Sequence, residues 1–563
     1  DRPLRLAVTS AARRAPGPAA TLAAAVALLV ALPVLVVVAR VGADSGGLFS
    51  HLAGTVLLRY LRNTVALALG VGLVSAILGV STAWLVSVCR FPGSRWLRWA
   101  LLLPLAIPAY LSAYAYADAL QFAGPVQTLL RTTFEWSAGD YWFPRVRSLP
   151  GAILVLSLGL YPYVFLAARS AFLEQSLCVL EVSRTLGSGP WGAARRVALP
   201  LARPAIVAGL ALVLMETLAE FGAVQHLAVD TFATGIYRTF LLPDPAALVA
   251  AAQLSTCLLA LVAFLLVLES RARRGARYHS TTLRHRQVPA TGLRGWRAAA
   301  ALLVCLAPIA LGFAVPLALF VRLTLAGGDR RGLELFGEFS RNSLLLGAVA
   351  SLVAVVLATF LSFARRPREG ILARLCHRLA GLGYAIPGGV IAIGILTCVT
   401  WFDRRLVGGL GSWFGFSTGL ILSGSIAALV YGYQTRFLPV ALGFVASGLQ
   451  RVRPSLDQAA RTLGASPLRS RLQVTLPLLR GSMAAAALLV FVDVMKELPA
   501  TLILRTFGYE TLAVRIHQLA SEERLSEAAT GGLVLIVLGV LPVLLLGSFL
   551  ERAHRGARSE WNR

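Results

Sequence analysis

The sequence predicts an all-α protein that crosses a membrane many times and consists of two similar halves. Apolar residues occupy 57% of the 563 positions. Uncharged stretches of about 20 residues recur along the whole chain, and a helix of that length crosses a hydrocarbon layer of ~30 Å. Asparagine, glycine and proline residues of the first half recur in the second at a nearly constant offset. These features predict a polytopic membrane protein with an internal repeat.

About twelve transmembrane helices are predicted, six in each half. The first span follows a basic segment and precedes many others, so we expect a retained anchor and not a cleaved signal. The spans of the first half are predicted at 19–40, 63–89, 98–120, 150–172, 203–225 and 245–269. The spans of the second half are predicted at 298–322, 342–364, 380–401, 417–440, 481–502 and 527–550.

The distribution of arginines predicts the orientation. The formal net charge is +27, but the basic residues gather in short segments between apolar stretches, so binding of nucleic acid is not expected. The segment 270–297 contains eight arginines and no acidic residue. The positive-inside rule places this linker in the cytoplasm, and with it both chain ends and the segment 364–378. The acid-bearing segment 327–339 then lies outside.

An internal repeat divides the chain. Asn63 and Asn342 lie 279 positions apart, and so do Pro108 and Pro387. Because each half has an even number of predicted spans, both halves cross the membrane in the same direction, as a parallel repeat. The expected parts are a first half of six spans (1–269), a basic cytoplasmic linker (270–297) and a second half of six spans (298–563).

The hydrophilic segments 181–200 and 458–477 match each other at an offset of 277. Each combines a polar helix, a glycine free to adopt a positive φ, a second helix and a proline that opens the next span. Such a segment forms a rigid helical elbow outside the bilayer, which is able to transmit force. The residues that define the elbows are Glu181, Gly187 and Pro200 in the first, and Gln458, Gly464 and Pro477 in the second.

The spacing within these elbows resembles the EAA loop of binding-protein-dependent ABC importer permeases. The resemblance implies the type I ABC importer permease fold, and it implies that the elbows dock on ABC ATPase subunits and couple them to transport. Because one chain carries both elbows, it also implies one permease chain and two ATPase subunits per complex. Gln458 departs from the family pattern, because an amide with Asp457 beside it replaces the usual acid.

We expect no catalytic centre and no bound cofactor in this chain. A nucleotide-binding loop of the GxxxxGK[ST] type needs a lysine, and the only lysine of the chain, Lys496, lies in the sequence VMKEL. No catalytic constellation stands out among the seven histidines, and the six scattered cysteines show no metal or disulfide spacing. ATP and Mg²⁺ are therefore expected on separate ATPase subunits.

Charged residues in two matched spans form a candidate translocation pathway. At the offset of 277, Glu216 matches Asp493 and Glu220 matches Glu497, and the members of each pair are four residues apart, on one side of a helix. Ionisable groups within a membrane are costly and mark transport pathways by default. The alternative is structural: Lys496 pairs with Asp493, or Glu220 lies in the outer headgroup region.

Tyr110, Tyr114 and Asp118 recur at four-residue intervals in the predicted span 98–120 and extend the candidate pathway. The tyrosines fit either an aromatic belt or a pathway of oxygen ligands, which suit a hard and highly charged cation. The four acids of the matched spans outnumber the one lysine there, which also favours a cationic cargo. The predicted transient ligands of such a cation are Glu216, Glu220, Asp493 and Glu497, with Lys496 offsetting part of their charge.

Longer motifs resemble the fused permeases of ferric-iron ABC importers, among them LPLAIPAYLSAYAYADALQFAGPVQTLLR and DVMKELPATLILRTFGYETLAVRIHQLASEERL. The resemblance covers nearly the whole chain apart from the N-terminal segment and the basic linker. It implies a protein of the bacterial inner membrane, surrounded by lipid, that translocates Fe³⁺ delivered by a periplasmic iron-binding protein. Thiamine, a polyamine or a phosphonate are alternative cargoes of the same architecture. An ion-driven secondary transporter with two parallel six-helix halves is the alternative of a different class, and it has no need of paired elbows.

Overall fold

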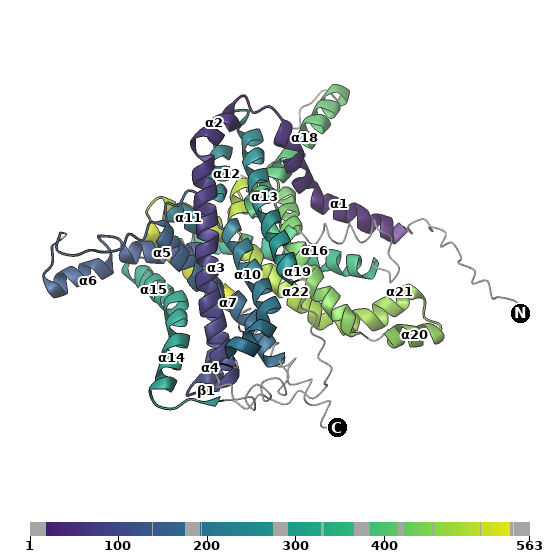
Figure 1. Ribbon diagram of the computed structural model, residues 1–563. Helices are drawn as coiled ribbons and strands as arrows, with labels where there is room; N and C mark the ends of the chain where they lie inside the picture. Colours follow the sequence, from purple (N-terminus) through teal and green to yellow (C-terminus); the bar gives the residue numbers. More distant parts are fainter. Residues whose placement is uncertain are drawn as a thin grey trace, which may run out of the picture.

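The structure, a computed structural model, describes residues 18–137, 139–174, 192, 194–273, 291–327, 332–364, 383–414, 421–452, 454–506, 508–540 and 544. Most of these residues belong to helices, and helices of both halves pack together in one assembly (Figure 1). The protein is therefore an all-α polytopic membrane protein, as the sequence predicts.

The first half contains long helices with shorter helices between them. A π-helical turn, Ala194–Ala198, leads directly into one of the long helices, Leu199–Ala219. The bounds are α1 (Pro18–Ala39), α2 (Leu48–Thr55), α3 (Leu57–Val88), α4 (Ser94–Ala100), α5 (Ala109–Leu120), α6 (Pro125–Phe134), α7 (Leu149–Glu174), α10 (Leu199–Ala219), α11 (Gly222–His226), α12 (Phe232–Phe240) and α13 (Ala247–Arg273).

The second half repeats this order. A two-residue strand at its start, β2 (Thr291–Gly292), pairs in parallel with β1 (Cys89–Arg90) of the first half. A π-helical turn, Arg471–Thr475, leads into α22. The bounds are α14 (Trp296–Ile309), α15 (Val315–Gly327), α16 (Gly332–Ala364), α18 (Gly388–Phe414), α19 (Ile426–Arg451), α20 (Pro454–Thr462), α21 (Pro467–Ser470), α22 (Leu476–Lys496), α23 (Pro499–Leu504) and α24 (Leu512–Ser521), followed by an apolar helix at Leu525–Val540.

Eight of the described helices are long and apolar enough to cross a membrane. A ninth span is counted if Ser94–Ala106 and Ala109–Phe134 together form one, although these two segments are bent by 86°. The bend falls at Pro108, where Ile107 is extended (φ −96°, ψ 119°), because a proline disfavours the helical conformation in the residue before it. The predicted span 98–120 is therefore a broken helix and not a straight one.

Three other predicted spans also differ from the helices observed. α18 and α19 overlap the predicted spans 380–401 and 417–440, but charged side chains lower their apolar character. The described part of the twelfth predicted span, 527–550, belongs to the apolar helix Leu525–Val540, and residues 541–550 apart from 544 lie outside the described residues. By length and composition, the described residues thus support eight or nine spans, fewer than the predicted twelve.

The two halves repeat hydrogen bonds as well as sequence. The Asn63 side-chain amide donates to the Asp230 carbonyl oxygen at 3.0 Å, and the Asn342 side-chain amide donates to the Glu510 carbonyl oxygen at 3.3 Å. α10 and α22, which lead to the site, are both 21 residues long. These matched bonds tie α3 and α16 to the loops that precede α12 and α24.

The first helix of each half packs against the opposite half. α1 contacts α16, α18 and α19 of the second half, and α14 contacts α3 and α4 of the first. Figure 1 shows α14 beside α3 and α4, α15 beside α5, and α1 beside α18. The α1–α18 contact is close at Gly394, where an added Cβ would overlap the Pro33 carbonyl group. Each half therefore completes its packing only with a helix of the other.

Glycines permit the close packing of α3 and α10 on α7. A Cβ added at Gly79 would lie 2.7 Å from the Val164 Cβ, and one added at Gly209 would lie 2.9 Å from the Tyr163 carbonyl oxygen. In a membrane the lipid tails are as apolar as the side chains, so helices associate through small residues and close contact. This packing fixes α7, whose Tyr163 reaches the candidate site.

Candidate functional site

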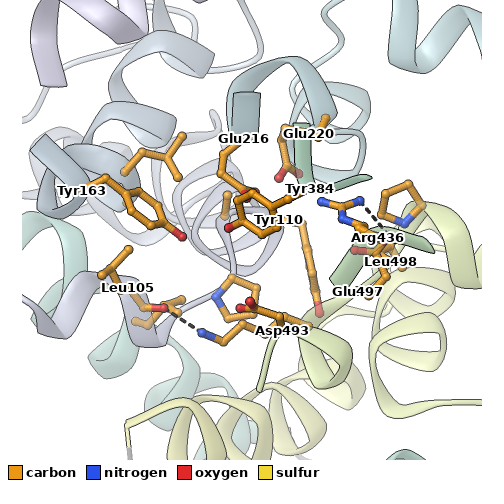
Figure 2. A pocket seen from close by; sticks show the side chains of 18 of the residues that line it. Leu105, Tyr110, Tyr163, Glu216, Glu220, Tyr384, Arg436, Asp493, Glu497 and Leu498 are labelled. Atoms are coloured by element: carbon orange, nitrogen blue, oxygen red, sulfur yellow. Dashed lines mark hydrogen bonds and ion pairs between the residues drawn. The ribbon is translucent and has the colours of Figure 1, made fainter. Parts of the chain in front are cut away.

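A polar cavity of about 130 Å³ lies between the two halves. This volume is large enough for several water molecules. Figure 2 shows acidic, basic and phenolic side chains around it, from several helices. Its polar lining residues are Tyr110, Tyr163, Glu216 and Glu220 from the first half, and Tyr384, Arg436, Asp493, Lys496 and Glu497 from the second.

All four acids that the sequence assigns to the pathway line this cavity. Their helical register differs from the prediction. α10 ends at Ala219 and α22 ends at Lys496, and the next residue of each, Glu220 and Glu497, has extended backbone angles. The two acids of each half therefore do not lie on one continuous helix, although both reach the same cavity.

The side chains of Glu220 and Glu497 are hydrogen-bonded to the short helices that follow α10 and α22. Glu220 Oε1 accepts a hydrogen bond from the backbone N–H of Ala223 at 2.8 Å, and Glu497 Oε1 accepts one from Ala500 at 3.1 Å. These N–H groups lie in the first turns of α11 and α23, where a negative charge is stabilised by the unpaired donors and the helix dipole. Pro499 opens α23 and marks the second break in the sequence.

Lys496 connects the two halves across the cavity. Its Nζ donates a hydrogen bond of 2.8 Å to the carbonyl oxygen of Leu105 (Figure 2). The ammonium group also interacts electrostatically with Asp493 and Glu216. Lys496 thus lies near two of the acids and contacts the backbone just before the helix break at Pro108. That it offsets part of their charge during transport stays a prediction.

Arg436 is a second cation in the cavity, which the sequence analysis missed. Its Nη1 lies 3.0 Å from Glu497 Oε1, and the two side chains are 8% and 5% exposed. α18 begins at Gly388, where an added Cβ would overlap both charged groups. Matching the two halves does not reveal Arg436, because the residue 277 positions earlier is Gly159. The available signal was a lone arginine within the predicted apolar span 417–440.

Three tyrosines complete the polar lining. The Tyr384 hydroxyl interacts with the carboxylate of Glu216, and Tyr163 lies beside Tyr384. The Tyr110 side chain is 3% exposed, and within the described part of the chain its hydroxyl has no hydrogen-bond partner. The cavity therefore offers phenol groups from both halves beside its carboxylates.

The predicted stripe of Tyr110, Tyr114 and Asp118 divides in the structure. The Tyr114 hydroxyl lies 2.6 Å from Nδ1 of His517, in the buried core and outside the cavity lining. Asp118 accepts a hydrogen bond from Gln121 at 3.3 Å and does not line the cavity either. One helical turn raises the chain by about 5 Å, so the second and third members of the stripe are carried away from the cavity along α5.

The second elbow has a helix–glycine–helix form. α20 ends two residues before Gly464, whose φ is +88°, and α21 follows. This left-handed conformation favours glycine, because a Cβ destabilises it. Pro477 is the second residue of α22, and Gln458 is exposed on α20.

Asp457 holds the second elbow together. Its Oδ1 accepts a hydrogen bond of 2.6 Å from the Ser470 hydroxyl, and its Oδ2 lies 2.8 Å from Arg461. The acid beside Gln458 is therefore engaged within the elbow. In the first elbow, Glu181 and Gly187 lie outside the described residues, whereas Pro200 is the second residue of α10.

Among the described residues, no group of three or more His, Cys, Asp or Glu side chains is arranged to hold a metal ion. The four carboxylates of the cavity are therefore not a preformed metal centre. Their role as transient ligands of a passing cation stays a prediction.

Comparison with known proteins identifies the family. The model of the "Binding-protein-dependent transport system inner membrane component" family matches residues 72–274 and, separately, residues 350–557. These matches cover more than half of the chain. The chain belongs to this family. It is a permease subunit of an ABC importer in the bacterial inner membrane, a non-enzymatic transport protein whose partners are ATPase subunits and a substrate-binding protein.

Individual relatives differ in cargo. The chain is similar to the Fe(3+)-transport system permease protein FbpB 2 of Haemophilus influenzae, with 26% identity over 500 residues, which are 87% of this chain and 89% of the relative. The probable ABC transporter permease protein y4fN of Sinorhizobium fredii is 24% identical over 81% of each chain. The putative 2-aminoethylphosphonate transport system permease protein PhnV of Salmonella typhimurium is 28% identical over 210 residues, 37% of this chain and 73% of the relative.

Proposed function

We propose that this permease imports Fe³⁺ delivered by a periplasmic iron-binding protein. The observation that carries the proposal is the cavity between the halves, lined by four carboxylates and three tyrosines. Carboxylate and phenol oxygens are suitable ligands for a hard and highly charged cation. The likeness to the Fe(3+)-transport permease, which extends over most of both chains, supports the same cargo.

In the proposed complex one permease chain binds two ABC ATPase subunits, one at each elbow, and ATP and Mg²⁺ stay on those subunits. The chain ends and the basic linker face the cytoplasm, and the binding protein docks on the opposite side. ATP-driven closure of the ATPase subunits shifts the balance between inward-facing and outward-facing arrangements of the two halves. The cavity is then open to one side of the membrane at a time.

An anionic cargo is the second candidate, because Arg436 and Lys496 line the same cavity and one relative is named for a phosphonate. A guanidinium group suits the oxygen atoms of a phosphonate. However, Arg436 already pairs with Glu497, and Lys496 donates to the Leu105 carbonyl oxygen. Both cations are thus engaged by the protein, which favours the cationic cargo.

Uptake measurements distinguish the two cargoes. Cells that lack other iron and phosphonate importers would carry this permease with its ATPase and binding protein, and would receive radiolabelled Fe³⁺ or 2-aminoethylphosphonate. We expect iron accumulation about tenfold above that of a control with an inactive ATPase, and no accumulation of phosphonate. Accumulation of phosphonate without iron would refute the proposed cargo.

A further inference from the structure

Arg436 brings one positive charge close to every acid of the cavity. The residue extends from α19 and is 6% exposed, with Nη1 at 3.0 Å from Glu497 Oε1. Its guanidinium group also interacts electrostatically with Glu216, Glu220 and Asp493. In Figure 2 its charged end points into the space between the acids of the two halves. Arg436 thus interacts with all four carboxylates, whereas Lys496 interacts with Asp493 and Glu216.

Part of this guanidinium group has no partner. Its Nε is buried and makes no hydrogen bond within the described residues, and the same holds for the Tyr110 hydroxyl on the same cavity. Buried polar groups without partners cost free energy, so they are uncommon in a settled protein interior. Two polar atoms of the cavity wall thus have no partner among the described protein groups.

The repeat does not require an arginine at this position. The first-half counterpart, Gly159, lines the same cavity without a side chain. Well-packed apolar side chains are often as stabilising as a buried ion pair, so stability alone does not explain Arg436. The absence of a side chain at Gly388 nevertheless leaves room for the Arg436–Glu497 pair. At this matched position the cavity therefore receives a positively charged side chain from the second half and none from the first.

We propose that Arg436 is the resident counter-cation of the empty pathway and determines which cations enter it. The proposal rests on the import of a cation proposed above. In the empty cavity the guanidinium group screens the carboxylates, and an entering cation has to take its place among them. Because Coulomb attraction increases with charge, a trivalent ion competes with the single charge of Arg436 far better than a divalent one does. Arg436 thus lowers the affinity of the cavity for every cation, and only an ion that the carboxylates attract strongly displaces it.

The test measures metal binding by the purified permease–ATPase complex without nucleotide. Mn²⁺ binding is followed by electron paramagnetic resonance and Tb³⁺ binding by luminescence. Binding that disappears in the Glu216→Gln, Asp493→Asn variant is assigned to the cavity. We expect Arg436→Met to increase the Mn²⁺ affinity about tenfold. The Tb³⁺ affinity increases by at least the same factor, because a fixed positive charge opposes a trivalent ion at least as strongly as a divalent one. The control Arg436→Lys, which keeps the charge, stays within about threefold of the unmodified complex.

A second comparison separates screening of the whole cavity from simple pairing with Glu497. Arg436→Met leaves the buried carboxylate of Glu497 unpaired, which destabilises the fold. The comparison is therefore repeated in complexes that carry Glu497→Gln, with and without Arg436→Met. If Arg436 screens the other acids, adding Arg436→Met to Glu497→Gln again increases the Mn²⁺ affinity severalfold.

Two results would overturn the inference: an unchanged Mn²⁺ affinity in the Glu497→Gln background, or equal Mn²⁺ affinities of the unmodified complex and Arg436→Met. Neither measurement uses iron transport. A complex that fails to take up iron therefore refutes the proposed cargo, whereas the binding data decide the role of Arg436.

Discussion

Gly388 leaves the space in which Arg436 and Glu497 form their ion pair at the start of α18. The residues of the first half that match Gly388 and Arg436 are Ala109 and Gly159, and neither carries a charge. Each half thus provides two carboxylates to the cavity, whereas both cations, Arg436 and Lys496, come from the second half. At the scale of single residues, function follows from where the two halves differ as much as from where they agree.

Gly388→Ala should therefore disturb the ion pair. The added Cβ would overlap Arg436 Nη1 and Glu497 Oε1, and overpacking of this kind costs about 1–3 kcal/mol. We expect a lower midpoint of thermal unfolding of the purified complex. Gly389→Ala is the matched control, because the nearest atom to its added Cβ is Ile503 Cδ1 at 3.9 Å. Equal midpoints for the two variants would show that Gly388 is not required by the pair.

The internal repeat allowed the four acids of the cavity to be predicted from the sequence, but it gave no indication of Arg436. Glu216, Glu220, Asp493 and Glu497 occupy matched positions, so comparison of the halves finds them and the structure brings them to one cavity. Arg436 has no matched cation and is found only through its contacts. Sequence spacing also does not show where a helix ends, so the break before Glu220 was not foreseen.

At the scale of elements, helix breaks position the site, and in the proposed complex the elbows connect it to the ATPase subunits. The breaks at Pro108 and Pro387 lie 279 positions apart, and both were visible in the sequence as matched prolines. The breaks after α10 and α22 lie 277 positions apart. A broken helix exposes N–H and carbonyl groups that bind charged side chains, which continuous helices do not offer. The breaks therefore place polar backbone beside the cavity.

Gly464→Val should uncouple the second elbow. Gly464 has a φ of +88°, and a residue with a Cβ destabilises this conformation by about 1–2 kcal/mol. We expect the stimulation of ATP hydrolysis by the loaded binding protein to decrease severalfold, with basal hydrolysis retained.

Gly443→Val is the matched control for this substitution. Gly443 lies within α19, has no neighbouring atom within 4 Å of an added Cβ and is not a positive-φ glycine. Full stimulation in Gly464→Val, measured in complexes that assemble normally, would contradict a coupling role for this elbow.

At the scale of the whole molecule, the two halves form one structure. The first helix of each half packs on the other half, and buried apolar clusters include side chains from both. The all-α class was predictable from the length of the apolar stretches, and the duplication was predictable from the polar residues that recur at a constant offset. The packing of the first helix of each half against the other half was not predictable, because a span that is apolar along its whole length does not indicate which helix it will contact. Twelve spans were expected, and the described residues support eight or nine. The difference comes from the bent helix at Pro108, the polar residues of α18 and α19, and the part of 527–550 that lies outside the described residues.

The central claim is that a cation crosses between the halves through the acidic cavity. Its most direct test is the uptake of radiolabelled Fe³⁺ by complexes that carry Glu216→Gln together with Asp493→Asn, with Glu523→Gln, an exposed acid, as the control. Removing both charges weakens the attraction for a trivalent ion, so we predict uptake below about a tenth of the unmodified rate, with assembly and basal ATP hydrolysis retained. Normal iron uptake by the doubly neutralised permease, or loss of its assembly, would contradict the claim.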